Sequence, residues 1–496
     1  MALRKVFGIE TEYGIQQRGA GESNPIAASS VLINAYVTEL QRKVGWDFED
    51  ESPGRDARGF AREGSMPPEV ETHLVNAVLT NGARYYVDHA HPEYSSPECS
   101  DARQIVVWDK AGERILAASM EAAERSLPNG QGIVVYKNNS DGKGNSYGTH
   151  ENYLMDRAVP FGRIVQHVMP HFVTRQIYTG AGKIGTEASS TFGLDVPFQL
   201  TSRADFFEEE VGLETTLKRP IVNTRDEPHA DAQKYRRLHV IVGDANLAEV
   251  STFLKVGVTG IVLCMIEDDV FGEKDFSLAS PVQALRRVSY DVSLSAPLEM
   301  ARGGTMTALE IQWELFDLAR KYAEDRGLEA VEASVGASVL ERWESVLSAL
   351  ETDPMSLSGV LDWVAKHRLF TAYRERHGCD WTDARLAAMD LQYHDVRPSR
   401  SLFERLGLER VVGEDEVLAA VSEPPRTTRA YFRGRCLQRW APQIAAANWD
   451  SLVFDLGAEP LRRVPMMEPL RGTADIVDTL LDGCTSPAEL IARLDS

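Results

Sequence analysis

Strand-like and helix-like segments alternate irregularly along this chain, and no pattern repeats with a period of about 20 to 50 residues. Solenoids and propellers depend on such repeats, so both are disfavoured. Thr307 and Glu310 form a capping box ahead of an apolar stripe, and Ser486 with Glu489 predicts a second helix start. Alternating apolar and polar residues predict strands at 5–15, 83–88, 133–137 and 237–243. The expected fold class is α+β.

The chain has 496 residues, and its 53 Lys and Arg residues against 74 Asp and Glu residues give a formal net charge of −21. This length allows two to four domains, or one large catalytic domain with an appendage. The negative charge would be repelled by phosphate backbones and by anionic membranes unless basic residues gathered on one face. We therefore expect neither a nucleic acid nor a membrane as a partner.

The cysteines and the N-terminus both indicate a cytoplasmic protein. Five cysteines lie at least 48 positions apart without a C-x-x-C motif, which is typical of a reduced compartment. Residues 1–15 lack the apolar stretch of a signal peptide and carry Glu10 and Glu12 instead. The most apolar run, Val256–Ile266, is shorter than the ~20 residues of a membrane helix and is expected in the core.

Two interruptions suggest the domain organisation. Residues 46–71 combine charges of both signs with Gly and Pro and show no periodicity, which predicts an inserted mobile loop. The chain breaks again at 422–428. We expect a catalytic domain over 1–425 and a small C-terminal domain over 426–496.

The sequence G-I-E-T-E-Y-G places Glu10 and Glu12 two positions apart on a predicted strand, so both carboxylates lie on one face about 6.6 Å apart. Two such oxygen ligands suit Mg²⁺, which takes one or two carboxylates together with nucleotide phosphates. A solvated strand face is the simpler alternative for any E-x-E pattern. Flanking Gly8 and Gly14 favour a site, because they leave space above this face.

The segment 84–94 is the richest in reactive side chains. Arg84, Tyr86 and Asp88 alternate on a predicted strand, which aligns a cation, a phenol and a carboxylate. Asp88 could act as general base or nucleophile, Arg84 could hold phosphate, and Glu93 could complete a metal shell. Charge alternation on an exposed strand remains the alternative.

His89 and His91 offer a different chemistry, because H-x-H followed by a carboxylate can bind Zn²⁺ in a hydrolase. Pro92 predicts a turn at this point, and no cysteine or third histidine is close in sequence. The two histidines would otherwise pack the loop.

Basic residues concentrate at 218–239 in this otherwise acidic chain. They could bind phosphate or an acidic polypeptide through charge-assisted hydrogen bonds, or form a solvated face. A sparser basic group lies near the expected domain junction and includes Arg429 and Arg433. Trp449 could stack on a purine, although burial is the commoner outcome for Trp.

Five stretches of the chain resemble, in order, one branch of the carboxylate-amine ligase superfamily related to glutamine synthetase. This branch handles the prokaryotic ubiquitin-like protein, Pup. The stretches are GIETEYG, ARYYVDHAHPEYSSPEC, YKNNSDGKGNSYGTHENYL, VNTRDEPHADAQKYRRLHVIVGD and the NWDS region. The resemblance implies a glutamine synthetase-like large domain, in which an antiparallel sheet cradle binds ATP and Mg²⁺, with a small C-terminal domain packed against it.

The resemblance also implies roles for individual residues. It identifies Asp88 as the catalytic aspartate, and Ser96 stands where family members have a nucleotide-contacting Thr. The family's magnesium positions correspond to Glu10, Tyr86 and Glu93, and its ATP-contacting positions to Arg84 and Trp449. Matched motifs and side-chain chemistry add Glu12 to the metal ligands, His239, Arg429 and Arg433 to the nucleotide site, and Arg225, Arg236 and Arg237 to the substrate site.

Members of this family either form or cleave the bond between Pup and a lysine. The insertion at 46–71 and the short spacing in D-H-A-H-P-E-Y resemble the cleaving branch. We therefore expect an ATP- and Mg²⁺-dependent deamidase and depupylase acting on Pup and pupylated proteins, linked to the bacterial proteasome. The Pup ligase activity is the alternative, and a non-catalytic Pup-binding module is a third possibility. Whether Asp88 attacks the carbonyl or activates water stays open.

Overall fold

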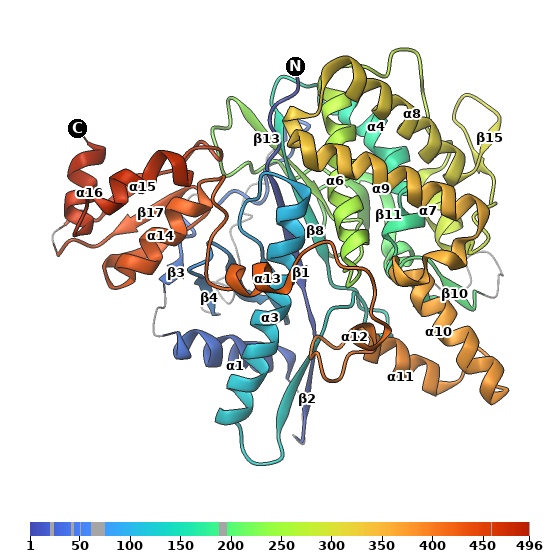
Figure 1. The fold of residues 1–496 in the computed structure, drawn as a ribbon, viewed down its shortest axis with the longest axis horizontal. Coiled ribbons are helices and arrows are strands. Elements are labelled where there is room, and N and C mark those ends of the chain that lie inside the picture. Colours follow the sequence, from blue (N-terminus) through green and yellow to red (C-terminus); the bar gives the residue numbers. More distant parts are fainter. Residues whose placement is uncertain are drawn as a thin grey trace.

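The computed structural model describes residues 1–19, 24–40, 44–49, 51–60, 75–187, 196–457 and 459–495. A ten-stranded sheet runs through the middle of these residues (Figure 1). Its strands, in spatial order, are β13 (Tyr235–Val240), β8 (Thr149–Asp156), β1 (Phe7–Glu12), β6 (His91–Ser95), β5 (Arg84–Asp88), β4 (Asn76–Val78), β3 (Val44–Trp46), β16 (Ile444–Ala447), β17 (Ser451–Phe454) and β18 (Arg462–Pro465). Neighbours pair antiparallel except β3 and β16, which are parallel.

Four two-stranded sheets accompany the large one. They pair β2 (Gly14–Arg18) with β7 (Gly132–Tyr136), β9 (Lys183–Ile184) with β10 (Phe198–Gln199), β11 (Phe207–Gly212) with β12 (Arg219–Asn223), and β14 (Leu298–Glu299) with β15 (Thr305–Met306). The strand expected over 5–15 is thus divided into β1 and β2. The division falls at Tyr13, whose backbone N–H donates to Pro92 O at 3.0 Å before the chain turns to pair with β7.

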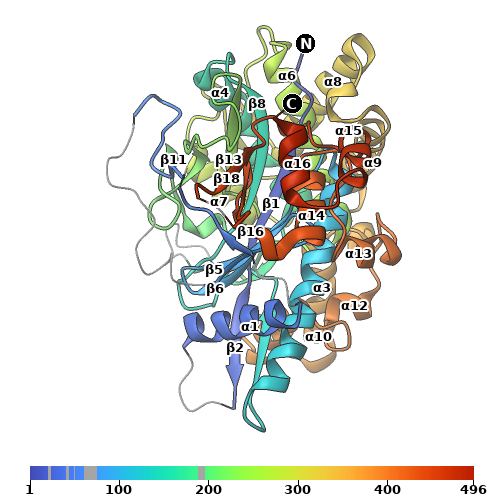
Figure 2. The same cartoon turned by 90° about the vertical axis from the view of Figure 1, so that its left-hand side faces the viewer.

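Helices cover one face of the large sheet and extend beyond it (Figures 1 and 2). They are α1 (Pro25–Glu39), α3 (Ala102–Ser126), α4 (Phe161–Thr174), α5 (Gln176–Thr179), α6 (Glu249–Glu267), α7 (Pro281–Tyr290), α8 (Ala308–Arg326), α9 (Ala333–Thr352), α10 (Asp362–His377), α11 (Ala384–Tyr393), α12 (Leu402–Leu406), α13 (Glu414–Ala420), α14 (Ala430–Trp440), α15 (Ala474–Asp482) and α16 (Pro487–Leu494). The expected α+β class, with a sheet flanked by helices, is confirmed.

The predicted helix starts are confirmed in atomic detail. Thr307 and Glu310 form the complete capping box of α8, and Ser486 accepts a hydrogen bond from the backbone N–H of Glu489 at the start of α16. Helix α6 contains the apolar run and is long and apolar enough to cross a membrane by length and composition alone. Its apolar window is wholly buried inside the protein, so packing in the core accounts for that composition.

Strand β1 shows why the site lies where it does. Its residues alternate strictly, with Phe7, Ile9 and Thr11 buried towards the helices and the two glutamates on the other face. Phe7 and Ile9 belong to the main apolar core, which also contains the buried side of α6. The polar face of the strand therefore remains available for chemistry.

The end of the chain completes the same sheet. Strands β16, β17 and β18 and helices α14–α16 enclose an apolar cluster to which Val44, Trp46 and Val78 of β3 and β4 also contribute. The boundary near 425 stays a prediction. Of the insertion expected at 46–71, residue 50 and residues 61–71 lie outside the described residues. Residues 55–57 are held against 224–226 by backbone hydrogen bonds.

Candidate active site

A cavity of about 950 Å³ opens on the polar face of β1, β5 and β6. The loops 141–148, 215–219 and 225–229 form its other walls, and Trp449 from the C-terminal segment also lines it. The lining includes Glu10, Glu12, Arg84, Tyr86, Asp88, Glu93, Arg225, Arg237 and Trp449, all expected at the site.

Strand register brings the acidic residues together. Glu12 of β1 lies opposite Glu93 of β6, and Glu93 in turn lies opposite Tyr86 of β5. Directly opposed residues in antiparallel strands point to the same face, so these three side chains form one row across the sheet. Asp88 follows two residues after Tyr86 on the same face, next to this row. The expected alternation of Arg84, Tyr86 and Asp88 towards one side is thus present.

The carboxyl groups of this row and of Asp88 have pKa values that are shifted in opposite directions. Burial and the neighbouring Asp88 raise the pKa of Glu12 to about 8, and burial with the same neighbour raises the pKa of Glu93 well above its ordinary value. For Asp88, burial is outweighed by a hydrogen bond from His89 at 2.8 Å, and its pKa falls to about 2. Within the described residues, no Lys or Arg forms an ion pair with Glu12, Glu93 or Asp88. The row lacks cationic partners and suits a bound metal ion.

A second group of polar side chains, built around Glu10, lies beside this row. Glu10 Oε2 is 3.5 Å from Nδ1 of His150, and the ring of His150 meets the ring of His239 edge-on at 5.0 Å. Asn152 ties the group together, since it donates to Glu10 Oε1 at 2.7 Å and contacts His239 Nδ1 at 3.0 Å. Burial lowers the pKa of both histidines, which favours the neutral imidazole that can bind a metal.

Ligand atoms in two groups lie within 4.8 Å of one another: Glu10 with His150 and His239, and Glu12 with Asp88 and His89. His91 belongs to neither group among the described residues. Its Nδ1 lies 3.0 Å from Tyr13 O, and its ring stacks on Tyr147 at 4.2 Å. The two histidines of the H-x-H pattern therefore do not converge on one ion, which removes the geometric basis for that zinc site.

The remaining expected residues divide between the cavity and its supports. Arg236 and Arg237 are neighbours on β13 and point to opposite faces, so only Arg237 lines the cavity. Arg236 instead donates to Val159 O at 2.9 Å and lies 3.6 Å from Asp226. The structure does not bring Arg236 into the site, because side chains alternate along a strand.

Arg429 and Arg433 hold Glu98 behind the cavity wall. Arg429 Nε donates to Glu98 at 2.7 Å, and Arg433 contacts the same carboxylate and donates to Trp449 O at 3.0 Å. Arg429, Ser96 and Trp449 also line a smaller apolar cavity of about 80 Å³ next to the first. Arg433 is fully buried, and its contacts position the Trp449 loop.

One cavity arginine, Arg203, has no clear sequence signal. Arg203 is 1% exposed yet lines the cavity, and burial lowers its pKa to about 10. It comes from an irregular segment and donates to the backbone oxygen of Gly243 at 3.3 Å. Arg219 lies nearby and donates to Ser146 O at 2.9 Å. These two guanidinium groups add positive charge opposite the acidic row, which suits an anionic group of a ligand.

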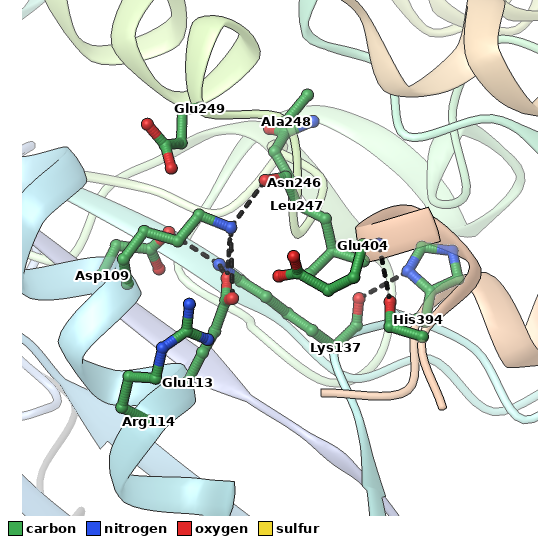
Figure 3. Close-up of polar contacts among 12 residues, drawn as sticks. Asp109, Glu113, Arg114, Lys137, Asn246, Leu247, Ala248, Glu249, His394 and Glu404 are labelled. Atoms are coloured by element: carbon green, nitrogen blue, oxygen red, sulfur yellow. Dashed lines mark hydrogen bonds and ion pairs between the residues drawn. The ribbon is translucent and has the colours of Figure 1, made fainter. Parts of the chain in front are cut away.

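A buried ionic network supports the cavity from behind (Figure 3). Lys137, at the end of β7, donates to Asp109 at 2.6 Å and to Glu113 at 2.8 Å. Lys110 donates to Glu113 at 2.9 Å, and His394 Nδ1 lies 2.7 Å from Lys137 O. The network fixes the position from which the chain enters the cavity loop at 138–148.

Among the described residues, Glu12 and Glu93 have no Lys or Arg partner, whereas Glu10 lies 3.7 Å from Arg237. Imidazoles and buried guanidinium groups complete the site on one face of the sheet. Such a set of side chains suits a ligand that carries anionic groups and a cation. The family model described as "Pup-ligase protein" matches residues 5–453. The chain belongs to this family.

Similar proteins cover almost the whole chain. A depupylase from Acidothermus cellulolyticus is 54% identical, with 99% of each chain covered. A Pup deamidase/depupylase from Mycolicibacterium smegmatis is 49% identical over 99% of this chain and 100% of that protein. A Pup–protein ligase from Sanguibacter keddieii is 38% identical over 97% of this chain and 100% of the ligase.

Two solved structures of the ligase PafA share the fold. The complex of PafA with Pup has a TM-score of 0.81 and 34% identity, and covers 99% of this chain and 94% of that one. The complex of PafA with ADP has a TM-score of 0.74 and 38% identity, and covers 82% of this chain and 90% of that one.

Proposed function

We propose that this protein is a Pup deamidase and depupylase, an amide hydrolase that converts the C-terminal Gln of Pup to Glu and cleaves the isopeptide bond between Pup and lysine. The observation that carries the proposal is the level of identity over the full chain. Relatives named depupylase or Pup deamidase/depupylase are 54% and 49% identical, whereas the ligase relative is 38% identical. The Pup ligase alternative is therefore disfavoured.

Asp88 carries the chemistry in this proposal. Its low pKa keeps the carboxylate ionised at neutral pH, and it lines the cavity at the end of β5. The group can attack the substrate carbonyl carbon or remove a proton from a water molecule that does so. In the metal-free protein Glu12 forms a hydrogen bond with Asp88. A proton that Asp88 removes from water can pass to the departing nitrogen.

The cofactors in this proposal are ATP and Mg²⁺. The donor set passes a chemical test of fit, because Glu12 and Glu93 are buried carboxyl groups without a cationic partner among the described residues. Glu10, Glu12 and Glu93 would hold the metal, with Tyr86 as a neutral phenol beside Glu93. Arg84 and Trp449 would contact the nucleotide, supported by the ADP bound to a PafA relative. When bound, Mg²⁺ would supply positive charge that stabilises a developing oxyanion, and the nucleotide phosphates would help to hold the metal.

The other cations of the cavity serve the substrate. Arg225 and Arg237 line the same cavity as Asp88, where they can receive carboxylates of an acidic polypeptide such as the end of Pup. Arg203 and Arg219 lie on the loop side, where they can hold an anionic group against the acidic row. The proposed setting is the cytoplasm, supported by five free cysteines, and the pupylated partners link the protein to the bacterial proteasome.

The test incubates the purified protein with a pupylated substrate and follows the release of Pup on gels. Mass spectrometry of Pup ending in Gln follows its conversion to Glu. Activity should require nucleotide, stop after chelation and return with Mg²⁺. Full activity without nucleotide, restored by Zn²⁺ alone, would contradict the proposal. Binding of Pup with no change of its Gln would indicate a binding module.

A parallel reaction distinguishes the ligase. It supplies Pup ending in Glu, ATP and an acceptor protein. Formation of conjugates without their cleavage would assign the protein to the ligases.

A further inference from the structure

The side chain of Arg84 is held flat between two aromatic rings. Its guanidinium carbon lies 4.0 Å from the ring centroid of Trp46 and 3.9 Å from that of Tyr86. On its inner edge, Nε donates to Asn76 Oδ1 at 3.0 Å. These contacts restrain the plane of the guanidinium of Arg84, which lines the cavity, and leave its two terminal amino groups as the free edge.

That free edge has one charged neighbour. Glu51 Oε1 lies 3.9 Å from Arg84 Nη1, beyond hydrogen-bond distance. Within the described ranges, no other carboxylate forms an ion pair with Arg84, and no hydrogen bond engages its terminal amino groups. Among the described residues, the terminal amino groups of Arg84 therefore have no hydrogen-bond acceptor, and Arg84 lines the cavity.

Glu51 is held in place by the same ring that stacks on Arg84. Trp46 Nε1 donates to Glu51 Oε1 at 2.6 Å. The Trp46 backbone pairs with Ala447 in the sheet, and its ring meets Trp449 edge-on at 5.2 Å. Glu51 is thus a fixed counter-ion that the start of the insertion presents to the cavity.

We propose that Trp46 and Glu51 are positioning residues for Arg84: the indole holds the guanidinium plane, and the Glu51 carboxylate is the internal counter-ion that a phosphate of the bound nucleotide displaces. The two residues then act on affinity in opposite directions. The stack favours binding because it prepares the donor edge, whereas the carboxylate opposes binding because it competes for the same positive charge. This inference rests on the proposed function only in taking the ligand to be a nucleotide.

The test measures the affinity of the full-length protein for ADP by calorimetry in the presence of Mg²⁺. Glu51→Gln keeps the size and an oxygen acceptor for Trp46 but removes the charge, so the affinity should rise about threefold or more. Glu49→Gln is the matched control, because Glu49 belongs to the same segment, is exposed and pairs with Arg463. Its affinity should equal that of the wild type.

A second variant tests the stack. Trp46→Leu removes the ring and the Glu51 donor, and should weaken ADP binding about tenfold. Trp46→Phe keeps a ring against Arg84, so it should retain more affinity than Trp46→Leu. Circular dichroism checks the fold of each variant. A uniform loss of affinity in all variants would overturn the proposal, since a merely structural role cannot make Glu51→Gln bind more tightly.

The outcomes separate this inference from the proposed function. If Glu51→Gln binds ADP no better than Glu49→Gln, the inference is wrong while the hydrolase proposal stands. If the wild type binds no ADP, both fall. If the predicted changes in ADP affinity appear but Pup is not released from conjugates, the inference stands and the hydrolase proposal falls.

Discussion

Two buried acidic clusters lie on either side of the catalytic strands, and they are neutralised in opposite ways. Behind the sheet, Asp109 and Glu113 contact the ammonium groups of Lys110 and Lys137 (Figure 3). Although burial alone would raise it, those cations lower the pKa of Glu113 to about 2. In the cavity, burial and like charge raise the pKa of Glu12 to about 8.

The difference separates a structural cluster from a functional one. A protein that buries charge for stability supplies the opposite charge from its own side chains, because an unpaired buried ion is costly. A site that binds a cation has to leave this charge unbalanced until the ligand arrives. In the proposed function, the cavity is the acidic cluster that receives its cation from a ligand.

The largest expected effect comes from the reacting carboxylate. Asp88→Asn keeps the size but removes the base or nucleophile, so turnover of pupylated substrate should fall about a thousandfold or more. Nucleotide affinity should change little, and unfolding should remain cooperative. Release of Pup is followed on gels and ADP binding by calorimetry. Substantial remaining turnover would assign the chemistry to another residue.

The next largest effect concerns the stability that the buried ionic network behind the sheet provides. Lys137→Met leaves Asp109 and Glu113 short of a cation, and the free energy of unfolding should fall by about 3–5 kcal/mol. Urea unfolding at neutral pH measures this change. Lys143→Met, in the exposed loop that β7 leads into, is the control and should change stability by about 0.5 kcal/mol or less. Similar losses of unfolding free energy in both variants would show that the buried ionic network contributes no more to stability than an exposed lysine does.

Substitution of two matched glutamates should change the free energy of unfolding in opposite directions. Without metal, Glu113→Gln removes a paired charge and should destabilise the protein by about 2 kcal/mol, whereas Glu93→Gln relieves crowding and should stabilise it by about 1 kcal/mol. Mg²⁺ should then raise the melting temperature of the wild type and of Glu113→Gln, but raise that of Glu93→Gln much less. Thermal unfolding with and without Mg²⁺ measures both effects. The same sign for both substitutions would contradict the comparison.

The smallest expected effect depends on pH. In the folded, metal-free protein Glu12 keeps its proton up to a pH of about 8, whereas an ordinary glutamate releases it near 4.5. Between these values the unfolded state loses the proton first, so the Glu12 contribution to stability declines as pH rises. Glu12→Gln cannot ionise, and its stability relative to wild type should improve by at least about 1 kcal/mol between pH 5 and 8.5, since each unit of pKa shift corresponds to about 1.4 kcal/mol. Urea unfolding at the two pH values checks this. A constant difference would mean that the pKa of Glu12 is not raised.

The alternation of residues along the sequence predicts which side chains share one face of a strand. It does not predict the register in which two strands pair. The pattern alone places Glu10 and Glu12 on one side of a strand, and Arg84, Tyr86 and Asp88 on one side of another, as the structure shows. That Glu12 lies opposite Glu93 depends on how two strands pair, which no local pattern encodes.

The same limit explains the residues that sequence reasoning misplaced or overlooked. The alternation of side chains along β13 could have shown that Arg236 and Arg237 do not both line the cavity, because neighbouring residues on a strand point to opposite faces. Arg203 gives no such signal, since it stands in an irregular segment and reaches the cavity only through tertiary packing. The contact between Trp46 and Arg84 likewise depends on three strands lying side by side.

The parallel pairing of β3 with β16 has a consequence for synthesis of the chain. A ribosome makes Gly45 and Trp46 long before their partners Ala446 and Ala447. Until then the unfinished chain carries an open strand edge, which is a template for pairing with other chains. Glu98 likewise lacks its ion-pair partners until Arg429 and Arg433 have been made. The cavity wall around Trp449 is therefore completed only after residues 429–449 have been made, and chains that stall earlier would be inactive and prone to aggregate.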